Sequence, residues 1–110
     1  MRRMGSCLGL KAETIAEYKR IHAYIWPGVL ARITDRNIRN YAIFLKEHEN
    51  LLFVHFEYHG TDFEADSAKM AADPATREWW KICGPMQVPF ETRKKGEWWA
   101  STQQEVFHTV

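Results

Sequence analysis

The segment 39–58, RNYAIFLKEHENLLFVHFEY, decides the fold because it reads as two β-strands joined by a short polar loop. Aromatic and β-branched residues dominate 39–46 and 50–58, and the polar stretch EHE between them is typical of an antiparallel hairpin. In the second strand every second side chain from Leu52 to Tyr58 points to one face, while Leu51 and Phe53 point to the other. Because both faces carry large apolar groups, we expect both to be covered.

Residues 4–34 precede the hairpin and predict one strand followed by two helices. Residues 4–10 alternate weakly, which indicates a first strand, and the glycines in it leave room for a close neighbour. In 12–25, spacings of three, four and three residues place four side chains on one face of a helix: Ile15, Tyr18, His22 and Ile25. Proline is tolerated at the first position of a helix but not inside one, so a second helix is predicted from Pro27 to about Thr34.

Residues 61–109 follow the hairpin and predict two more helices and a last strand. The motif TDFE, which begins at Thr61, has the spacing of a capping box and predicts a helix to about residue 72. Asp73 before Pro74 is typical of a helix N-terminus, and this helix is expected to end near residue 84. We interpret 86–96 as a loop and 103–109 as a short final strand.

The order of these elements indicates a single α+β domain over residues 1–110. Strand, helix, strand, strand, helix, strand is the ferredoxin-like βαββαβ order, a four-stranded antiparallel sheet with its helices on one face. The other face of the sheet would then be bare, although the hairpin is apolar on both sides. A second copy of the chain packed sheet to sheet would cover it, so we expect a homodimer, a dimeric α/β barrel.

Composition and charge favour a small neutral ligand. The chain has 110 residues, 45% hydrophobic and 26% charged, and a formal net charge of +1, which gives no global field for nucleic acid or an anionic membrane. The isolated Cys7 and Cys83 argue against a disulfide scaffold and a structural zinc site, and fit a reducing, cytoplasmic setting. No apolar run is long enough to span a membrane, and no metal, nucleotide or serine-hydrolase motif is present.

His22 is the first candidate for chemistry, because it shares the apolar face of its helix with Tyr18. A histidine has an unperturbed pKa near neutrality and suits general acid or base catalysis, whereas Tyr18 would serve as a hydrogen-bonding partner. The alternative is a partly buried pair whose polar atoms find backbone or water partners. Tyr41, on the side of Ile43 in its strand, is either a sheet-core tyrosine or part of the same site. His55 is a lesser candidate for this pocket.

The chain contains 5 Trp, and four of them form the consecutive pairs Trp79–Trp80 and Trp98–Trp99. Consecutive residues on a helix point about 100° apart, so only one of Trp79 and Trp80 fits one core layer. An indole stacks well on the apolar face of a sugar, although core or interface packing is the alternative. The second pair would close a pocket or cover a dimer seam.

Five blocks of the sequence resemble the L-rhamnose mutarotase family: EYKRIHAYIWPGVL, NYAIFL, NLLFVHFEY, REWWK and QEVF. They occur in family order over most of the chain, about 4–81 and 103–108. The resemblance implies a cytoplasmic, cofactor-free homodimer that interconverts the α and β anomers of a neutral sugar, with no metal. It places the proton donor at His22 and sugar contacts at Tyr18, Tyr41, Trp79 and Trp80.

The segment 83–100 departs from the family pattern, since it contains a basic stretch and the second tryptophan pair. The resemblance favours L-rhamnose as the sugar, and L-fucose or another aldose is the alternative. A non-catalytic sugar-binding module is the alternative from another class. Fold analogy alone also admits a small cofactor-independent oxygenase or a haem-binding protein, although fold does not determine function.

Overall fold

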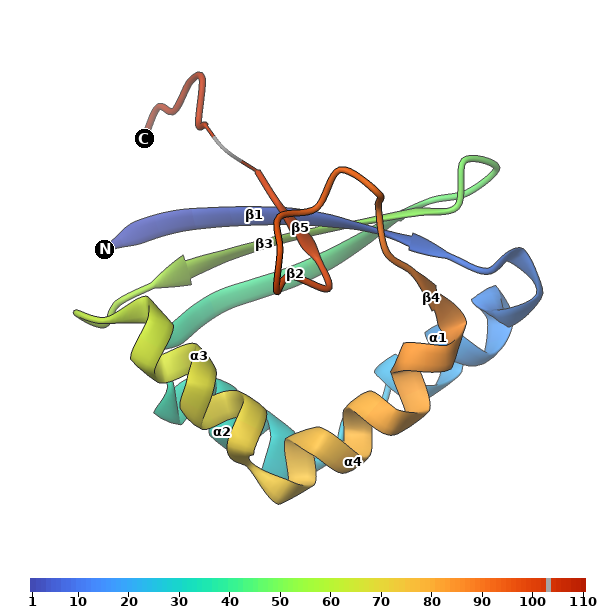
Figure 1. The fold of residues 1–110 in the computed structure, drawn as a ribbon, viewed down its shortest axis with the longest axis horizontal. Coiled ribbons are helices and arrows are strands. Elements are labelled where there is room, and N and C mark those ends of the chain that lie inside the picture. Colours follow the sequence, from blue (N-terminus) through green and yellow to red (C-terminus); the bar gives the residue numbers. More distant parts are fainter. Residues whose placement is uncertain (103) are drawn as a thin grey trace.

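The computed structural model describes residues 1–102 and 104–110, and the helices lie on one side of a curled antiparallel sheet (Figure 1). The elements in chain order are β1 (Arg2–Leu10), η1 (Ala12–Thr14), α1 (Ile15–His22), α2 (Pro27–Asp35), β2 (Ile38–Lys46), β3 (Leu51–Tyr58), α3 (Phe63–Ala72), α4 (Pro74–Cys83), η2 (Gly84–Met86), β4 (Gln87–Val88) and β5 (Ala100–Ser101). The predicted α+β class is confirmed. The strand order β2-β3-β1-β4 is the ferredoxin-like order, although Gln87–Val88 and not the predicted strand 103–109 takes the fourth place, and β5 also pairs with β1.

The predicted hairpin is confirmed as β2 and β3, which pair antiparallel, with β1 on the other side of β3. Leu52 of β3 lies opposite Leu8 of β1 and Leu45 of β2, so these three side chains share the face that the helices cover. Leu8 and Leu52 are almost completely buried there. The alternation seen in the sequence therefore specifies which face of the sheet becomes the core.

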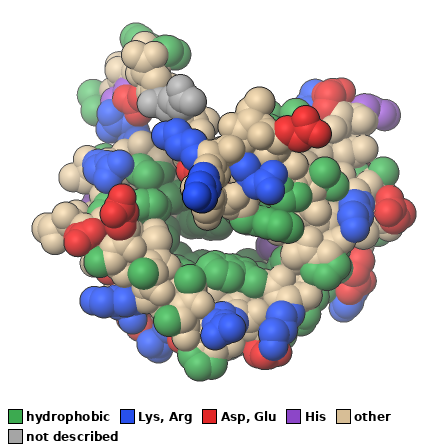
Figure 2. Space-filling model, viewed as in Figure 1, with side chains coloured by type: hydrophobic (Ala, Val, Ile, Leu, Met, Phe, Trp, Pro, Cys, Tyr) green, Lys and Arg blue, Asp and Glu red, His purple; other side chains and the backbone are tan. Residues whose placement is uncertain are grey.

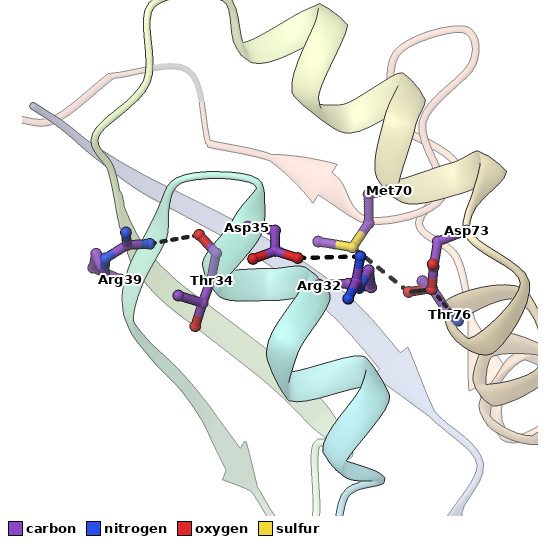
Figure 3. A network of polar contacts seen from close by, with 7 residues as sticks. All are labelled: Arg32, Thr34, Asp35, Arg39, Met70, Asp73 and Thr76. Atoms are coloured by element: carbon purple, nitrogen blue, oxygen red, sulfur yellow. Dashed lines mark hydrogen bonds and ion pairs between the residues drawn. The ribbon is translucent and has the colours of Figure 1, made fainter.

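The joint between α3 and α4 is held by a side-chain cap (Figure 3). Asp73 accepts hydrogen bonds from the backbone N–H and the hydroxyl of Thr76, each at 2.9 Å, and Thr76 is 2% exposed. This confirms Asp73 as the N-cap predicted for α4. At the start of α3 the sequence prediction was wrong by one residue, because Asp62 rather than Thr61 accepts the hydrogen bond from the N–H of Ala65, at 3.1 Å.

Two other predictions need correction. The first helix is shorter than 12–25, because a 3₁₀ turn precedes α1 and the helix ends at His22. The final strand predicted over 103–109 is not observed: residue 103 lies outside the described residues, and 104–110 form no strand. The edge of β1 is instead paired by β4 and β5, which belong to the segment after α4 (Figure 1). Short edge strands of two residues carry no recognisable alternation.

The face of the sheet away from the helices keeps a row of apolar side chains. Phe44, Phe53 and Cys7 are neighbours in register across β2, β3 and β1. Phe44 is 62% exposed and Phe53 is 42% exposed. Exposed apolar groups clustered in this way are typical of an interaction surface.

Candidate functional site

A hollow rimmed by hydrophobic side chains opens between the sheet and the helices (Figure 2). The cluster at the α1 end of this interior joins α1, α4 and the sheet, and it contains Tyr18, Trp79 and Cys83 among its buried members. Figure 1 shows α1 and α4 meeting the sheet at the same end, where β4 leaves α4. Side chains far apart in the sequence therefore converge there.

His22 and Tyr18 lie one turn apart on α1, so their side chains stack directly. The two ring centroids are 4.0 Å apart and the rings are inclined by 21°. His22 Nδ1 lies 2.8 Å from the carbonyl oxygen of Tyr18. Because a carbonyl only accepts, Nδ1 carries the hydrogen, and Nε2 of the neutral ring is left with a free lone pair.

Trp79 packs its ring against that histidine. The centroids of Trp79 and His22 are 5.3 Å apart in an edge-to-face arrangement, and Trp26 meets Trp79 in the same way, also at 5.3 Å. Trp79 lies on the buried face of α4 with Thr76 and Cys83, at spacings of three and four residues. No role in the site was predicted for Trp26. Its contact with Trp79 shows that Trp26 belongs to the aromatic cluster around His22.

The two tryptophans of α4 separate as the helical period predicts. Trp79 is 6% exposed and Trp80 is 47% exposed. Among the described residues, no ring contact joins Trp80 to His22, Tyr18 or Trp79. The structure therefore brings Trp79 to the histidine and leaves Trp80 with an open indole.

Tyr41 reaches the interior from β2. Its ring stacks on Phe56, with centroids 5.6 Å apart, and 41% of its surface is exposed. Burial of the hydroxyl raises the pKa of Tyr41, and nearby Tyr18 and Cys83 raise it further. The stack on buried Phe56 places the Tyr41 ring on the helix side of the sheet, the side on which Tyr18 also lies.

The titratable groups of this interior are uncharged at neutral pH. Burial raises the pKa of Tyr18 to about 12 and that of Cys83 to about 11. Burial lowers the pKa of His22 below its usual 6.5, partly offset by the hydrogen bond to the carbonyl of Tyr18. A charged ligand would lose its hydration here without gaining an ionic partner, so this set of groups suits a neutral, hydrogen-bonding molecule.

Gln87 was missed by sequence reasoning, which placed it in a loop. The structure has it in β4, where its Nε2 donates to the Tyr18 hydroxyl oxygen at 3.1 Å. Its Oε1 accepts from the indole Nε1 of Trp98 at 2.8 Å. The second tryptophan pair was the available signal, but no pattern in the sequence connects Trp98 with α1.

The site residues predicted from the sequence are mostly brought together. His22 contacts both Tyr18 and Trp79, and Tyr41 lies on the same side of the sheet, stacked on Phe56. His55 does not join them, because its position in β3 alternates with the buried ones and directs it to the opposite face. His55 is therefore excluded from this pocket.

Neither a metal cluster nor a membrane helix is found in the described part of the chain. Within residues 1–102 and 104–110, no three His, Cys, Asp or Glu side chains are grouped so that they could hold a metal ion. None of the described helices is both long enough and apolar enough to cross a membrane. Cys7 and Cys83 form no disulfide.

Comparison with known proteins gives one consistent family. The family model described as L-rhamnose mutarotase matches residues 3–109. An L-rhamnose mutarotase of Oceanobacillus iheyensis is 30% identical over 108 residues, which cover 98% of each chain. One from Sinorhizobium medicae is 34% identical over 96 residues, covering 84% of each chain. A crystal structure of an L-rhamnose mutarotase from Formosa agariphila has the same fold, with a TM-score of 0.77, 21% identity and full coverage of both chains.

Proposed function

The chain belongs to the L-rhamnose mutarotase family, and from this premise we propose that it interconverts the anomers of L-rhamnose with His22 as the proton donor. The observation that carries the proposal is the uncharged His22 ring, stacked on Tyr18, with its Nδ1–H committed to a backbone carbonyl. Such a ring exchanges protons through Nε2 alone. A rigid helix and Trp79 hold it in place.

Opening of a pyranose ring moves one proton from the anomeric hydroxyl to the ring oxygen while the bond between C1 and the ring oxygen breaks. Both oxygens are bonded to C1, so one imidazole nitrogen can serve both. In the proposed cycle, Nε2 of neutral His22 takes the hydroxyl proton and donates it to the ring oxygen. Rotation about C1–C2 and reversal of the same transfers close the ring as the other anomer. Positioned general acid–base catalysis typically contributes about 10² to 10⁴ in rate.

The sugar contacts in this proposal are Tyr18, Tyr41, Trp79 and Trp80. The two tyrosines carry neutral hydroxyl groups in the interior, and these can bind sugar oxygens. Trp80 has the open indole that stacking on a sugar face requires. Trp79 is mostly buried, so its contribution is the edge that it presents beside the His22 ring.

The experiment that tests this proposal is NMR of anomer exchange in L-rhamnose, with wild-type protein and with the His22→Ala variant. We expect wild type to accelerate the exchange and the variant to lose about 10²- to 10⁴-fold of the acceleration while remaining folded. The matched control is His108→Ala, at an exposed histidine near the C-terminus, which should retain full activity. Full activity of His22→Ala would refute the assignment of the proton donor.

The same assay over a panel of sugars identifies the substrate. We expect faster exchange for L-rhamnose than for L-fucose and other neutral aldoses. Binding of L-rhamnose without any acceleration would instead identify a sugar-binding module.

We also propose that a second copy of the chain covers the exposed face of the sheet. The apolar row formed by Phe44, Phe53 and Cys7 is the support, because a sheet face of this kind gains stability when water is removed from it. Light scattering should report a dimer for wild type and a monomer for Phe53→Glu. Tyr24→Glu, at a residue that is 86% exposed after α1, is the control and should remain dimeric.

A cytoplasmic location is proposed on the basis of the two cysteines. Cys7 and Cys83 are both unpaired, and Cys7 is accessible in part, which suits a reducing compartment. Cell fractionation with an antibody to the protein measures this directly. Recovery from an extracytoplasmic fraction would contradict it.

A further inference from the structure

We propose that Gln87 is a positioning residue for the sugar site, and that Trp98 sets the orientation in which its amide acts on Tyr18. The inference deepens the proposed function and rests on it. The contacts that carry it are two hydrogen bonds in series, from Trp98 Nε1 to Gln87 Oε1 at 2.8 Å and from Gln87 Nε2 to the Tyr18 hydroxyl at 3.1 Å.

Strand pairing places Gln87 next to Tyr18. Gln87 lies opposite Leu10 of β1, whose side chain is on the buried face of the sheet. Val88 lies opposite Gly9 and points to the other face. The two-residue strand β4 therefore directs the amide into the interior and leaves Val88 outside. The hydrogen bond from the N–H of Lys11 to the carbonyl of Met86, at 2.8 Å, holds the chain just before β4.

Trp98 is fastened by its neighbour Glu97. The Glu97 carboxylate accepts from the backbone N–H of Lys94 at 3.0 Å and from the hydroxyl of Ser101 at 2.5 Å. Ser101 belongs to β5, which pairs with β1. Glu97 thus ties the loop to β5 through Ser101 and closes a turn within the loop through Lys94, although Trp98 itself is 48% exposed.

The donor and acceptor chemistry of the three side chains fixes the direction of both hydrogen bonds. An indole nitrogen only donates, so the atom of Gln87 that faces Trp98 must be its oxygen. The amide nitrogen then faces Tyr18 and donates to its hydroxyl oxygen. The hydroxyl hydrogen of Tyr18 cannot point back at a donor, so it is turned away from Gln87. Tyr18 is thereby preset to donate a hydrogen bond to an oxygen of the sugar.

Variants of Gln87 distinguish this role from simple packing. In Gln87→Glu the shape is kept, but the carboxylate accepts at both ends and draws the Tyr18 hydrogen toward itself. Gln87→Met has a similar length and no polar atom, and it leaves the Tyr18 hydroxyl free to rotate. We therefore expect Gln87→Glu to lose about tenfold or more in kcat/KM for L-rhamnose and Gln87→Met to lose less. A packing role predicts the opposite order, because glutamate is the closer match in shape.

Trp98→Phe tests the hydrogen bond from Trp98 to Gln87. The variant keeps an aromatic ring and removes the N–H donor, so the Gln87 side-chain amide is free to rotate by about 180° and exchange its oxygen and nitrogen. We expect KM for L-rhamnose to rise about 2- to 10-fold with kcat within about twofold of wild type, because uniform binding is lost and chemistry is untouched. Gln104→Glu is the charge-matched control for Gln87→Glu. Gln104 is exposed and makes none of these contacts, so its variant should behave as wild type.

An activity-independent measurement accompanies the kinetics. In ¹⁵N-labelled protein the indole N–H signal of Trp98, assigned as the one that Trp98→Phe removes, should shift upfield and exchange faster with water in Gln87→Met. A double variant completes the test: adding Gln87→Glu to Tyr18→Phe should cost no further activity, because the hydroxyl that it misdirects is gone.

These results separate the two hypotheses. Wild-type protein that leaves L-rhamnose exchange at the buffer rate overturns the proposed function. Active wild type together with Gln87→Glu at or above the activity of Gln87→Met overturns the role of Gln87. An unshifted Trp98 indole signal in Gln87→Met overturns the role of Trp98.

Discussion

Gly9→Ala is expected to damage both stability and activity, because Gly9 lies where β4 meets β1. A Cβ on Gly9 would stand 2.8 Å from the carbonyl oxygen of Val88 and 3.2 Å from the Val88 Cβ. The first of these atoms is backbone and is held by the pairing of Gly9 with Val88, so it cannot rotate away as a side chain could. The strand β4 must therefore move outward.

The magnitude follows from the cost of overpacking. Forcing an extra methyl group into a filled site typically costs about 1 to 3 kcal/mol, and each kcal/mol lowers the Tm of a domain of this size by roughly 4 °C or more. We expect Gly9→Ala to lower the Tm by roughly 4 to 15 °C. Because Gln87 adjoins Val88, the shift of β4 should also break the hydrogen bond from Gln87 to Tyr18. At a temperature where both proteins are folded, kcat/KM of the variant should therefore be below that of wild type.

Thermal unfolding followed by circular dichroism, together with NMR anomer exchange, measures both effects. Gly28→Ala on α2 is the matched control, because its Cβ would lie 3.6 Å from the Cβ of Ala75, an ordinary contact. In a helix this change gains about 0.5 to 1 kcal/mol, so the control should hold or raise the Tm. A Tm and activity for Gly9→Ala equal to those of wild type would refute the packing of β4 against β1 described above.

Three further predictions concern proton transfer, capping and the tryptophan pair. Since His22 acts from its neutral form and burial lowers its pKa, kcat/KM should be level at neutral pH and fall as pH drops through a value below 6.5; a rise in acid would contradict this. Asp73→Ala should lower the Tm at pH 7. Hydrogen bonds from Thr76 hold the pKa of that carboxylate below its usual 3.8, so in a Tm series against pH the difference from wild type should vanish as pH falls through it. In denaturant unfolding Trp79→Ala should lose about 3 to 5 kcal/mol, whereas Trp80→Ala should keep stability and weaken sugar binding, and equal losses would contradict their different burial.

Most of the fold could be predicted because its signals are local. The alternation of β3, the proline that opens α2 and the Asp-Pro step before α4 each act within a few residues. The end of α1 and the last strand were mispredicted. At the last strand the sheet edge is formed by two-residue strands that exist only through pairing with β1.

The residues of the candidate site also divide into those that local spacing predicts and those that only the tertiary structure brings together. Tyr18 and His22 could be found together because a helical turn places them on one face, and the stack at 4.0 Å confirms that geometry. Trp79 and Tyr41 come from distant segments, and only the resemblance to a family joined them to His22 in advance. Gln87 had no signal in the sequence, and the second tryptophan pair gave none that connected Trp98 with α1, since these hydrogen bonds depend on how β4 pairs with β1 and not on spacing in the chain.

The sequence by itself determined the hairpin, the faces of its strands and the pairing of Tyr18 with His22, because periods of two and 3.6 residues are properties of the local backbone. Only the tertiary structure decided which protons are free to act. The hydrogen bond from His22 Nδ1 to the Tyr18 carbonyl is local to α1, but the burial that keeps Tyr18 neutral and the Gln87 amide that orients the Tyr18 hydroxyl both arise from contacts between elements. Hydrogen-bond direction and desolvation are set by what lies nearby in space, and the order of residues does not contain them.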